Sequence, residues 1–280
     1  MGATHPNRIS ATALRVAVRR AAHQLLDSPP VFEDPLALRI IGEREAAKLR
    51  SRIGPAERPW NNSLRAWIAA RSRYAEDQLA AAVHRGITEY IILGAGLDTF
   101  AYRNPYPNLR VWEIDTAASQ AAKREMLQAA HIDIPPSLTF LPIDLETQPL
   151  QLQTNSPAFV SWLGVTPFLT RQAFENTLAA IAPIAAQLVF DYAVTPEALD
   201  EQDRFAFDIL SRRVAAAGEP YRLYFPPHTQ PPHCTVLEDL GKDEINARYF
   251  AHRNDNLAVA FTPARLVSCV PAKTSDTRAS

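Results

Sequence analysis

Apolar positions near the start of the chain recur at helical spacing. A first helix is predicted from Ser10, whose side chain suits an N-cap, to about Leu26, and the Pro29-Pro30 pair prevents it from continuing. A short helix over residues 34–41 then precedes a polar stretch over residues 44–59, which we expect to be mobile. The apolar stripe of the first helix consists of Leu14, Val18, Ala21, Ala22 and Leu25.

A longer helix follows, capped by Asn62 or Ser63 and ended by Gly86. Arg71 falls on the apolar stripe of this helix, and a buried guanidinium needs a partner. That partner is either a ligand carboxylate or a neighbouring Asp or Glu. The stripe itself consists of Leu64, Trp67, Ile68, Ala75, Leu79, Ala82 and Val83.

From residue 89 onward the pattern changes to short β-branched and aromatic runs that alternate with helical segments. Helices are predicted over residues 116–130 and 170–183. This alternation predicts an α/β fold, with a mostly parallel sheet and helices on both faces. The first five strands are predicted over residues 89–93, 109–115, 138–143, 158–162 and 186–191.

The remaining third of the chain is less regular. Residues 196–217 are helical and form the expected lid, and residues 220–234 contain five prolines, which exclude a regular helix. Residues 236–250 and 257–270 are expected to complete the sheet, with an antiparallel pair at its end. We therefore expect a helical extension or cap over residues 1–85, a core over residues 86–270 with a lid insertion at about 196–234, and a disordered tail over residues 271–280.

The segment LGAGLDTFAYR joins the first strand to a glycine turn. Gly94 and Gly96 allow a tight turn and leave room for a ligand on it, while Asp98 stands where a helix is expected to begin. A dinucleotide fingerprint would have a third glycine where this chain has Thr99. The carboxylate of Asp98, at the expected start of a helix, would repel diphosphate and suits a cationic or hydroxyl-bearing ligand. This favours S-adenosylmethionine over NAD. An ordinary turn without a ligand is the alternative.

Two later strands also end in acidic residues. Asp115 ends the second strand about twenty residues after the glycines, where a carboxylate is placed to accept ribose hydroxyls, or to cap the next helix. Asp144 and Leu145 follow the third strand, at positions near an adenine amino group and ring. Three strand ends thus place polar groups at one edge of the sheet, where α/β folds bind ligands.

Several motifs resemble the bacterial branch of the leucine carboxyl methyltransferase family, which includes carboxyl methyltransferases that tailor polyketides. These motifs are GAGLDTFAYR, the Glu113-x-Asp115 pair, Asp144-Leu145, SWLGVTPFLT, GEPYRLYF and RYFAHRND. The resemblance implies a Rossmann-like class I S-adenosylmethionine-dependent methyltransferase fold with a seven-stranded sheet. It also implies that Gly94, Asp115, Asp144 and Leu145 contact the cofactor and that Arg71 faces the methionine carboxylate or an acceptor carboxylate. Family members often have an acidic residue and a tyrosine where this chain has Trp162-Leu163 and Phe168, which puts the acceptor in question.

Composition narrows the function classes. The 280 residues carry a net charge of −1 and 47% hydrophobic residues, so the chain can bury a large core but has no field that attracts nucleic acid. Cys234 and Cys269 lack metal-type spacing, and the sequence MGATHPNRIS lacks the apolar core of a signal peptide. With no apolar run near the roughly 20 residues of a membrane span, we expect a cytoplasmic protein without a metal. Self-association remains open.

The residues suggested for acceptor chemistry lie in the second half of the chain. Trp162, Phe168, Tyr192, Tyr221 and Tyr224 are expected to line the acceptor side, with ordinary core packing as the alternative for Trp162 and Phe168. A carboxylate acceptor is already ionised at neutral pH and needs no base, whereas a phenol or an amine does. Candidate bases are His228, His233 and Tyr192, although loop histidines are commonly exposed and idle.

The sequence therefore predicts an S-adenosylmethionine-dependent O-methyltransferase that acts on a small molecule, through a carboxylate or phenolic hydroxyl of a secondary metabolite. N- or C-methylation on the same scaffold is an alternative, as is a non-catalytic protein that binds the cofactor or a partner. An NAD-dependent oxidoreductase is opposed by Asp98 and the missing third glycine.

Overall fold

The computed structural model describes residues 9–51, 59–152, 154 and 156–272, which form one seven-stranded sheet. The strand order is β3-β2-β1-β4-β5-β7-β6, with β1 to β5 parallel and β7 antiparallel to both of its neighbours. This confirms the predicted α/β fold with a mostly parallel sheet. The strands are β1 (Glu89–Leu93), β2 (Arg110–Asp115), β3 (Leu138–Pro142), β4 (Ala158–Trp162), β5 (Ala185–Ala193), β6 (Cys234–Leu240) and β7 (Ala264–Pro271).

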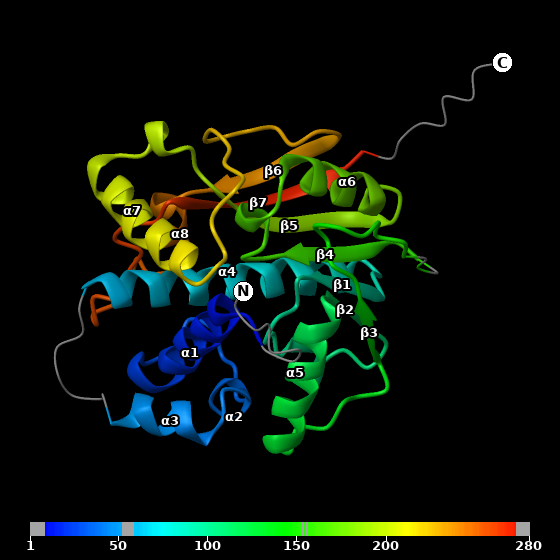
Figure 1. Ribbon diagram of the computed structural model, residues 1–280, viewed down its shortest axis with the longest axis horizontal. Helices are drawn as coiled ribbons and strands as arrows, with labels where there is room; N and C mark the ends of the chain where they lie inside the picture. The colour runs from blue at the N-terminus through cyan, green and yellow to red at the C-terminus, as the bar shows by residue number, and fades with distance from the viewer. Residues whose placement is uncertain (1–8, 52–58, 153, 155, 273–280) are drawn as a thin grey trace.

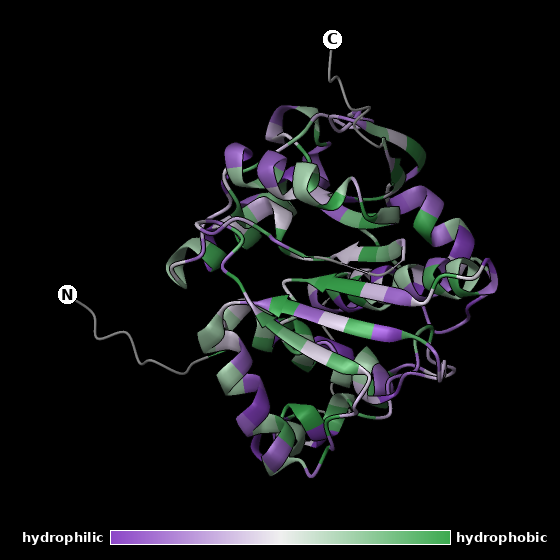
Figure 2. Cartoon of the chain, turned by 90° about the vertical axis from the view of Figure 1, so that its right-hand side faces the viewer, coloured by the Kyte–Doolittle hydropathy of each residue, from purple (hydrophilic) through white to green (hydrophobic). Residues whose placement is uncertain are grey.

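Helices cover both faces of the sheet (Figure 1). On one face lie α4 (Pro59–His84), α5 (Ala117–Ala129) and α8 (Lys242–Tyr249), and on the other lies α6 (Arg171–Ile181). Hydrophobic positions run along the central strands, whereas the surrounding helices carry many hydrophilic positions (Figure 2). Because β1 and β4 are buried along their whole length, their sequences are mostly apolar.

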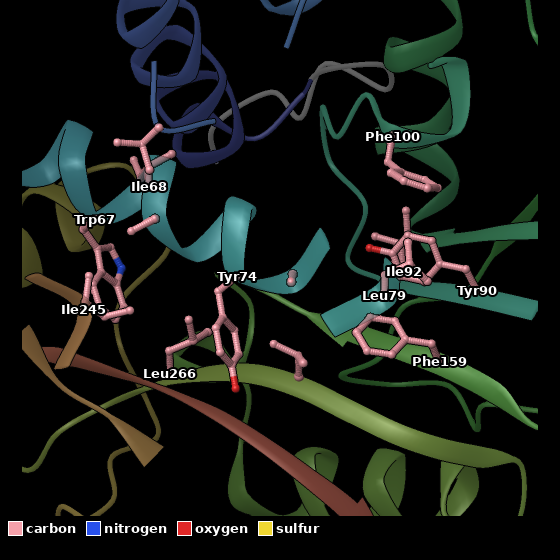
Figure 3. Close-up of a cluster of buried hydrophobic side chains, with 14 of the residues drawn as sticks. Trp67, Ile68, Tyr74, Leu79, Tyr90, Ile92, Phe100, Phe159, Ile245 and Leu266 are labelled. Atoms are coloured by element: carbon pink, nitrogen blue, oxygen red, sulfur yellow. The ribbon is translucent and has the colours of Figure 1, made fainter. Parts of the chain in front are cut away.

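The long helix α4 packs its apolar stripe directly on the sheet. Trp67 and Tyr74 point from α4 toward α8 and strand side chains, whereas Ile68 lies on the opposite side of α4 and points toward α1 (Figure 3). Tyr74 is fully buried, and its hydroxyl donates a hydrogen bond of 2.7 Å to Glu238 Oε2 on β6. The predicted helix therefore exists, but it begins at Pro59, so Asn62 and Ser63 lie within it and are not caps. Both side chains instead hold the loop before β7, through Asn256 and Phe261.

Three N-terminal helices pack together beneath α4: α1 (Ala11–Leu26), α2 (Ala37–Ile40) and α3 (Glu43–Arg50). The N-cap prediction for α1 is confirmed, since Ser10 Oγ accepts a hydrogen bond from Ala13 N. Helix α3 lies in the stretch that we expected to be mobile, of which residues 52–58 fall outside the described residues. It forms because Ala46 is buried against α1 and α2, and because acidic residues in its first turn and basic residues in its last suit the helix dipole.

The turn after β1 differs from the expectation. Instead of an α-helix, the chain forms a short 3-10 turn, η1 (Phe100–Tyr102), in which Asp98 Oδ1 accepts a hydrogen bond from Phe100 N. Pro105 and Pro107 follow closely, and each lacks the N–H that a longer helix requires.

The segment after β5 connects to the end of the sheet. The short 3-10 turn η3 (Pro196–Ala198) precedes α7 (Glu201–Ala216), and residues 220–233 contain no helix, as predicted. Another 3-10 turn, η2 (Thr166–Phe168), lies between β4 and α6. The expected run over residues 236–250 is strand only to Leu240 and then helix α8. Of the expected disordered tail, residues 273–280 lie outside the described part, whereas Pro271 ends β7. No helix in the described part is long and apolar enough to cross a membrane.

Candidate active site

A cavity of about 840 Å³ lies at the carboxyl ends of the parallel strands. It receives residues from the loops after β1 to β4, from α1 and α4, and from the segment after α7. This is the edge of an α/β sheet where ligands bind. We call it the first cavity, and the predicted residues that line it are Arg71, Gly94, Gly96, Asp98, Asp115, Asp144 and Phe168.

The glycine turn after β1 forms one wall of the first cavity. Gly94 has φ +65°, and its N–H donates a hydrogen bond of 2.7 Å to Ile114 O on β2. A Cβ at this position would lie 2.3 Å from Val165 Cγ2, so both the backbone conformation and the packing require glycine. The loop therefore approaches the segment after β4 more closely than any other residue type would allow.

Asp115 holds the glycine turn to the end of β2. Its Oδ2 accepts a hydrogen bond of 2.7 Å from Gly96 N, and its Oδ1 accepts one from Thr116 N. The alternative role as the cap of α5 belongs to Thr116, whose hydroxyl accepts from Ser119 N. Each carboxylate oxygen of Asp115 has a further lone pair for a ligand hydroxyl.

Asp144 and Leu145 have different surroundings. Asp144 lines the first cavity and accepts hydrogen bonds from Glu146 N and Thr147 Oγ1, which order the turn after β3. Leu145 is buried in the apolar cluster on the α6 face of the sheet and does not line the cavity. The neighbouring residue that does line it is Glu146, which the sequence analysis missed.

The donor set of the first cavity fits S-adenosylmethionine. Asp98, Asp115, Asp144 and Glu146 contribute carboxylates at one cavity, and this charge suits a cofactor with a sulfonium, an ammonium, ribose hydroxyls and an adenine amino group. The same charge would repel a diphosphate. Arg20 and Arg71 lie on the α1 and α4 side of the cavity, where a ligand carboxylate would find a cation.

Arg71 makes a buried ion pair with Asp191. The distance from Arg71 Nη1 to Asp191 Oδ2 is 2.6 Å, and Asp191 Oδ1 accepts a hydrogen bond of 2.6 Å from Gly164 N. A Cβ on Gly164, which has φ +71°, would lie 2.9 Å from Arg71 Nη2, so this glycine makes room for the guanidinium. Of the two partners considered for Arg71, the structure shows the neighbouring Asp. The signals for Asp191 and Gly164 were an acidic residue near the end of an apolar strand and the glycine in SWLGV.

A second cavity of about 460 Å³ adjoins the first. The two share Thr12, Val16, Arg71, Gly164 and Phe168 as lining residues. Tyr221 lines the second cavity, and its ring packs on Phe168 with a centroid distance of 5.2 Å. Burial and the neighbouring Asp191 raise the pKa of Tyr221 to about 12. Its hydroxyl is therefore protonated at neutral pH and able to donate a hydrogen bond.

Two aromatic residues proposed for the acceptor side lie elsewhere. Trp162 is fully buried on β4, stacked on Phe174 at 5.2 Å, so it belongs to the apolar core. Tyr224 packs on Phe207 and donates a hydrogen bond to Tyr221 O, which places it behind Tyr221 and outside both cavity linings.

The three candidate bases also lie away from both cavities. Tyr192 is within β5 and not after it, because β5 continues to pair with β7 up to Ala193. Its hydroxyl donates to Asp239 Oδ2 at 3.0 Å, and burial beside this carboxylate raises its pKa. His228 and His233 are exposed on the proline-rich segment, and both have positive φ.

A short segment after α7 crosses the first cavity beside the start of α1. Glu219 Oε2 accepts a hydrogen bond from Thr12 N at 3.3 Å, and Arg222 Nη1 donates one of 2.9 Å to Glu146 Oε1. Arg222 N also donates to Pro167 O. These contacts join the segment to both sides of the cavity. Glu219 and Arg222 belong to the GEPYRLYF motif, but the sequence analysis assigned neither residue a role in the site.

The strand order and the acidic cavity at the carboxyl ends of the strands define a class I methyltransferase. A solved structure with the same fold is that of a DUF574 family protein from Streptomyces avermitilis, with a TM-score of 0.55 and 14% identity over 94% of this chain and 98% of that one. At this identity the likeness concerns the fold alone.

Residues 13–182 match the family model described as leucine carboxyl methyltransferase, and the chain belongs to this family. It is 31% identical to "Putative S-adenosyl-L-methionine-dependent methyltransferase YktD" of Bacillus subtilis, over 90% of this chain and 95% of that protein. A protein of Frankia alni with the same general description is 30% identical over 66% of this chain and 68% of its own length. The protein is thus an S-adenosylmethionine-dependent methyltransferase, which confirms the family resemblance and the choice of cofactor made from the sequence.

Proposed function

We propose that the protein is an O-methyltransferase whose acceptor is a small-molecule carboxylic acid. The observation that carries this proposal is the position of the second cavity, which shares a wall with the first cavity, where the cofactor would bind. The second cavity is lined by Arg15, Arg19, Arg71 and Arg213. The single carboxylate in its lining, Asp191, is already paired with Arg71. The lining therefore favours an acceptor that carries negative charge.

The volume of the second cavity supports a small acceptor. Its roughly 460 Å³ falls within the range of about 300–1,000 Å³ that is usual for small-molecule pockets. Aromatic and aliphatic side chains supply most of the remaining lining, namely Leu64, Trp67, Ile68, Pro167, Phe168, Leu210, Val214 and Tyr221. Such a lining suits an acceptor with an apolar or aromatic body, and the resemblance to polyketide-tailoring enzymes supports a secondary metabolite.

S-adenosylmethionine supplies an electrophilic methyl group. The residues of this chain have to bind the acceptor, orient its nucleophilic oxygen and exclude water, and such alignment contributes about 7–11 kcal/mol to lowering a barrier. Arg71, Gly164 and Phe168 line both cavities, so this is where the acceptor oxygen would meet the cofactor. Asp115, Asp144 and the glycine turn would hold the nucleoside part.

A carboxylate fits this lining better than a phenol. With a pKa near 4 a carboxylate is ionised at neutral pH, whereas a phenol with a pKa of about 10 must first transfer its proton to a base. Asp191 is held by Arg71 and Gly164 N, and Tyr221, with its pKa raised to about 12, is a hydrogen-bond donor. Both groups thus suit an acceptor that arrives already deprotonated.

The test is the release of S-adenosylhomocysteine with matched panels of aromatic and aliphatic acids, phenols and amines at pH 6 to 9. We expect methyl esters from the acids, with kcat/KM nearly constant over this range because the acceptor is ionised throughout. A rate that rises tenfold per pH unit with phenols only, or turnover of amines only, would overturn the carboxylate assignment. Product analysis by mass spectrometry distinguishes esters from ethers and amides.

A further inference from the structure

Two helices each present both arginine and aliphatic side chains to the second cavity. On α1, the lining residues are Thr12, Arg15, Val16 and Arg19, whose spacing places them on one helix face. On α7, the lining residues are Leu210, Arg213 and Val214, again at spacings of three and four. Each helix thus contributes a continuous wall in which an aliphatic side chain lies next to a guanidinium.

Arg15 and Arg213 are exposed, so they stand at the rim of the cavity, whereas Arg71 is buried at the wall shared with the cofactor cavity. Among the residues that the structure describes, no carboxylate forms an ion pair with Arg15 or Arg213. The guanidinium of Arg213 lies over the ring of Trp60, 5.7 Å from its centroid, and Trp60 is itself stacked on Phe261 at 5.0 Å. The aromatic stack thus holds one rim cation in place without neutralising it.

The lining also contains apolar side chains from α4 and α7. Trp67 and Ile68 on α4 and Val214 on α7 are buried, and Leu210 is partly buried. An anionic group placed against these side chains would lose its hydration without gaining a partner. An anion in this cavity is therefore favourable beside a lining guanidinium, and among these Arg15 and Arg213 are the exposed ones.

We propose that the acceptor carries a second anionic group, distant from the carboxylate that is methylated, and that Arg15 and Arg213 bind this group. The proposal rests on the proposed function and specifies its substrate class as an amphipathic acid with an apolar body and an anion at each end. The reacting carboxylate lies at the shared wall, and the second anion, a carboxylate or a phosphonate or phosphate, lies at the rim. Charge-assisted hydrogen bonds at the rim select this substrate over the corresponding monoacid by about tenfold or more.

The experiment compares three acceptors with the same body: 3-phenylpropanoic acid, 3-(4-carboxyphenyl)propanoic acid and 3-(4-phosphonophenyl)propanoic acid. For each, kcat/KM is measured from the release of S-adenosylhomocysteine, and binding to the complex of the full chain with S-adenosylhomocysteine is measured by calorimetry. We expect at least a tenfold preference for one or both dianions over the monoacid. The relative performance of the carboxylate and phosphonate compounds identifies which anion the rim accepts.

Arg15→Gln and Arg213→Gln should each reduce the dianion-to-monoacid ratio by about tenfold. The control is Arg212→Gln, which removes an exposed arginine next to Arg213 that lines neither cavity and should leave the ratio unchanged. An equal reduction of the dianion-to-monoacid ratio in all three variants would indicate that the positive surface charge in general attracts the dianions. This result would overturn the assignment of Arg15 and Arg213 as the binding residues. Each variant is first checked for an unchanged melting temperature. If Arg213→Gln unfolds α7, the Arg15→Gln variant still tests the proposal, because Arg15 lies on a different helix.

The two proposals fail in different ways. Methylation of the monoacid and the dianions with equal kcat/KM would overturn the rim proposal and leave the carboxylate proposal standing. If no acid were methylated and calorimetry detected no binding of the monoacid or of the dianions, both the carboxylate proposal and the rim proposal would be overturned. Binding of the dianions that is tighter than that of the monoacid and is weakened in Arg15→Gln would support the rim even if another step limits turnover of these compounds.

Discussion

Arg71 and Asp191 form an ion pair of 2.6 Å between Nη1 and Oδ2, at the wall that the first and second cavities share. The two residues come from α4 and β5, which are 120 positions apart in the chain. The pair therefore couples the formation of the wall to the packing of α4 on the sheet. The pair also leaves only part of the guanidinium donors of Arg71 available to a ligand, because Asp191 holds the others.

Asp191→Asn should lower the free energy of unfolding by about 3–5 kcal/mol, because it leaves the guanidinium of Arg71 buried without a counter-charge. Replacing both residues, as in Arg71→Met with Asp191→Asn, should restore much of this loss. Urea unfolding of the two single variants and the double variant measures the coupling. If the two effects were simply additive, the pair would not stabilise the wall.

Asp115→Ala should weaken the binding of S-adenosylhomocysteine about ten- to a hundredfold, because each charged hydrogen bond to a ribose hydroxyl contributes about 1.5–3 kcal/mol. Calorimetric titration measures the change. The control is Asp133→Ala, which removes an exposed carboxylate from the loop before β3 and should leave affinity unchanged. Because Asp115 also accepts from Gly96 N, a lower melting temperature is expected as well. Unchanged affinity in a folded variant would contradict the ribose role.

Gly94→Ala should impair both stability and cofactor binding. The residue has φ +65°, which costs an L-residue about 1–2 kcal/mol, and its Cβ would overlap Val165 Cγ2. Adding Val165→Ala should relieve the overlap and leave only the backbone cost. Gly86→Ala is the matched control, since Gly86 also has positive φ but no atom lies within 4 Å of its added Cβ. Equal losses in Gly94→Ala and Gly86→Ala, measured by thermal unfolding, would mean that the overlap with Val165 is unimportant.

Features that depend on local pattern could be predicted from the sequence. The strands at residues 89–93 and 158–162, the cap at Ser10 and the cavity edge marked by Asp115 and Asp144 all follow from short-range rules about periodicity and strand ends. The mostly parallel seven-stranded sheet also followed, because the motifs resembled a family with a class I methyltransferase fold.

Features that depend on contacts between residues far apart in the chain could not be predicted from the sequence. Trp162 reads as a pocket aromatic at the end of a strand, but α6 places Phe174 over it and makes it core. The local pattern predicts that the fifth strand ends before Tyr192, because only pairing with β7 extends β5 that far. The arginines on α1 and α7 line one cavity only because the tertiary fold brings the two helices together, so neither helix alone indicated this cluster of arginines.

The buried pair of Glu113 and Lys123 predicts a dependence of stability on pH. Glu113 Oε2 lies 2.7 Å from Lys123 Nζ, and both side chains are about 1% exposed. Burial raises the pKa of Glu113 to about 7, although the Lys123 ammonium opposes this shift.

Because the pKa of Glu113 in the folded state lies above the unfolded value of about 4.3, the folded state binds the proton more tightly. This contribution to stability is complete below about pH 4.3 and is lost as pH rises to about 7. From pH 5 to pH 7.5, the free energy of unfolding should therefore decrease more for the natural chain than for the double variant Glu113→Gln with Lys123→Met, which removes both charges together. Urea unfolding at the two pH values measures this difference. An identical pH dependence in the two proteins would mean that Glu113 stays ionised throughout this range and that the ammonium outweighs its burial.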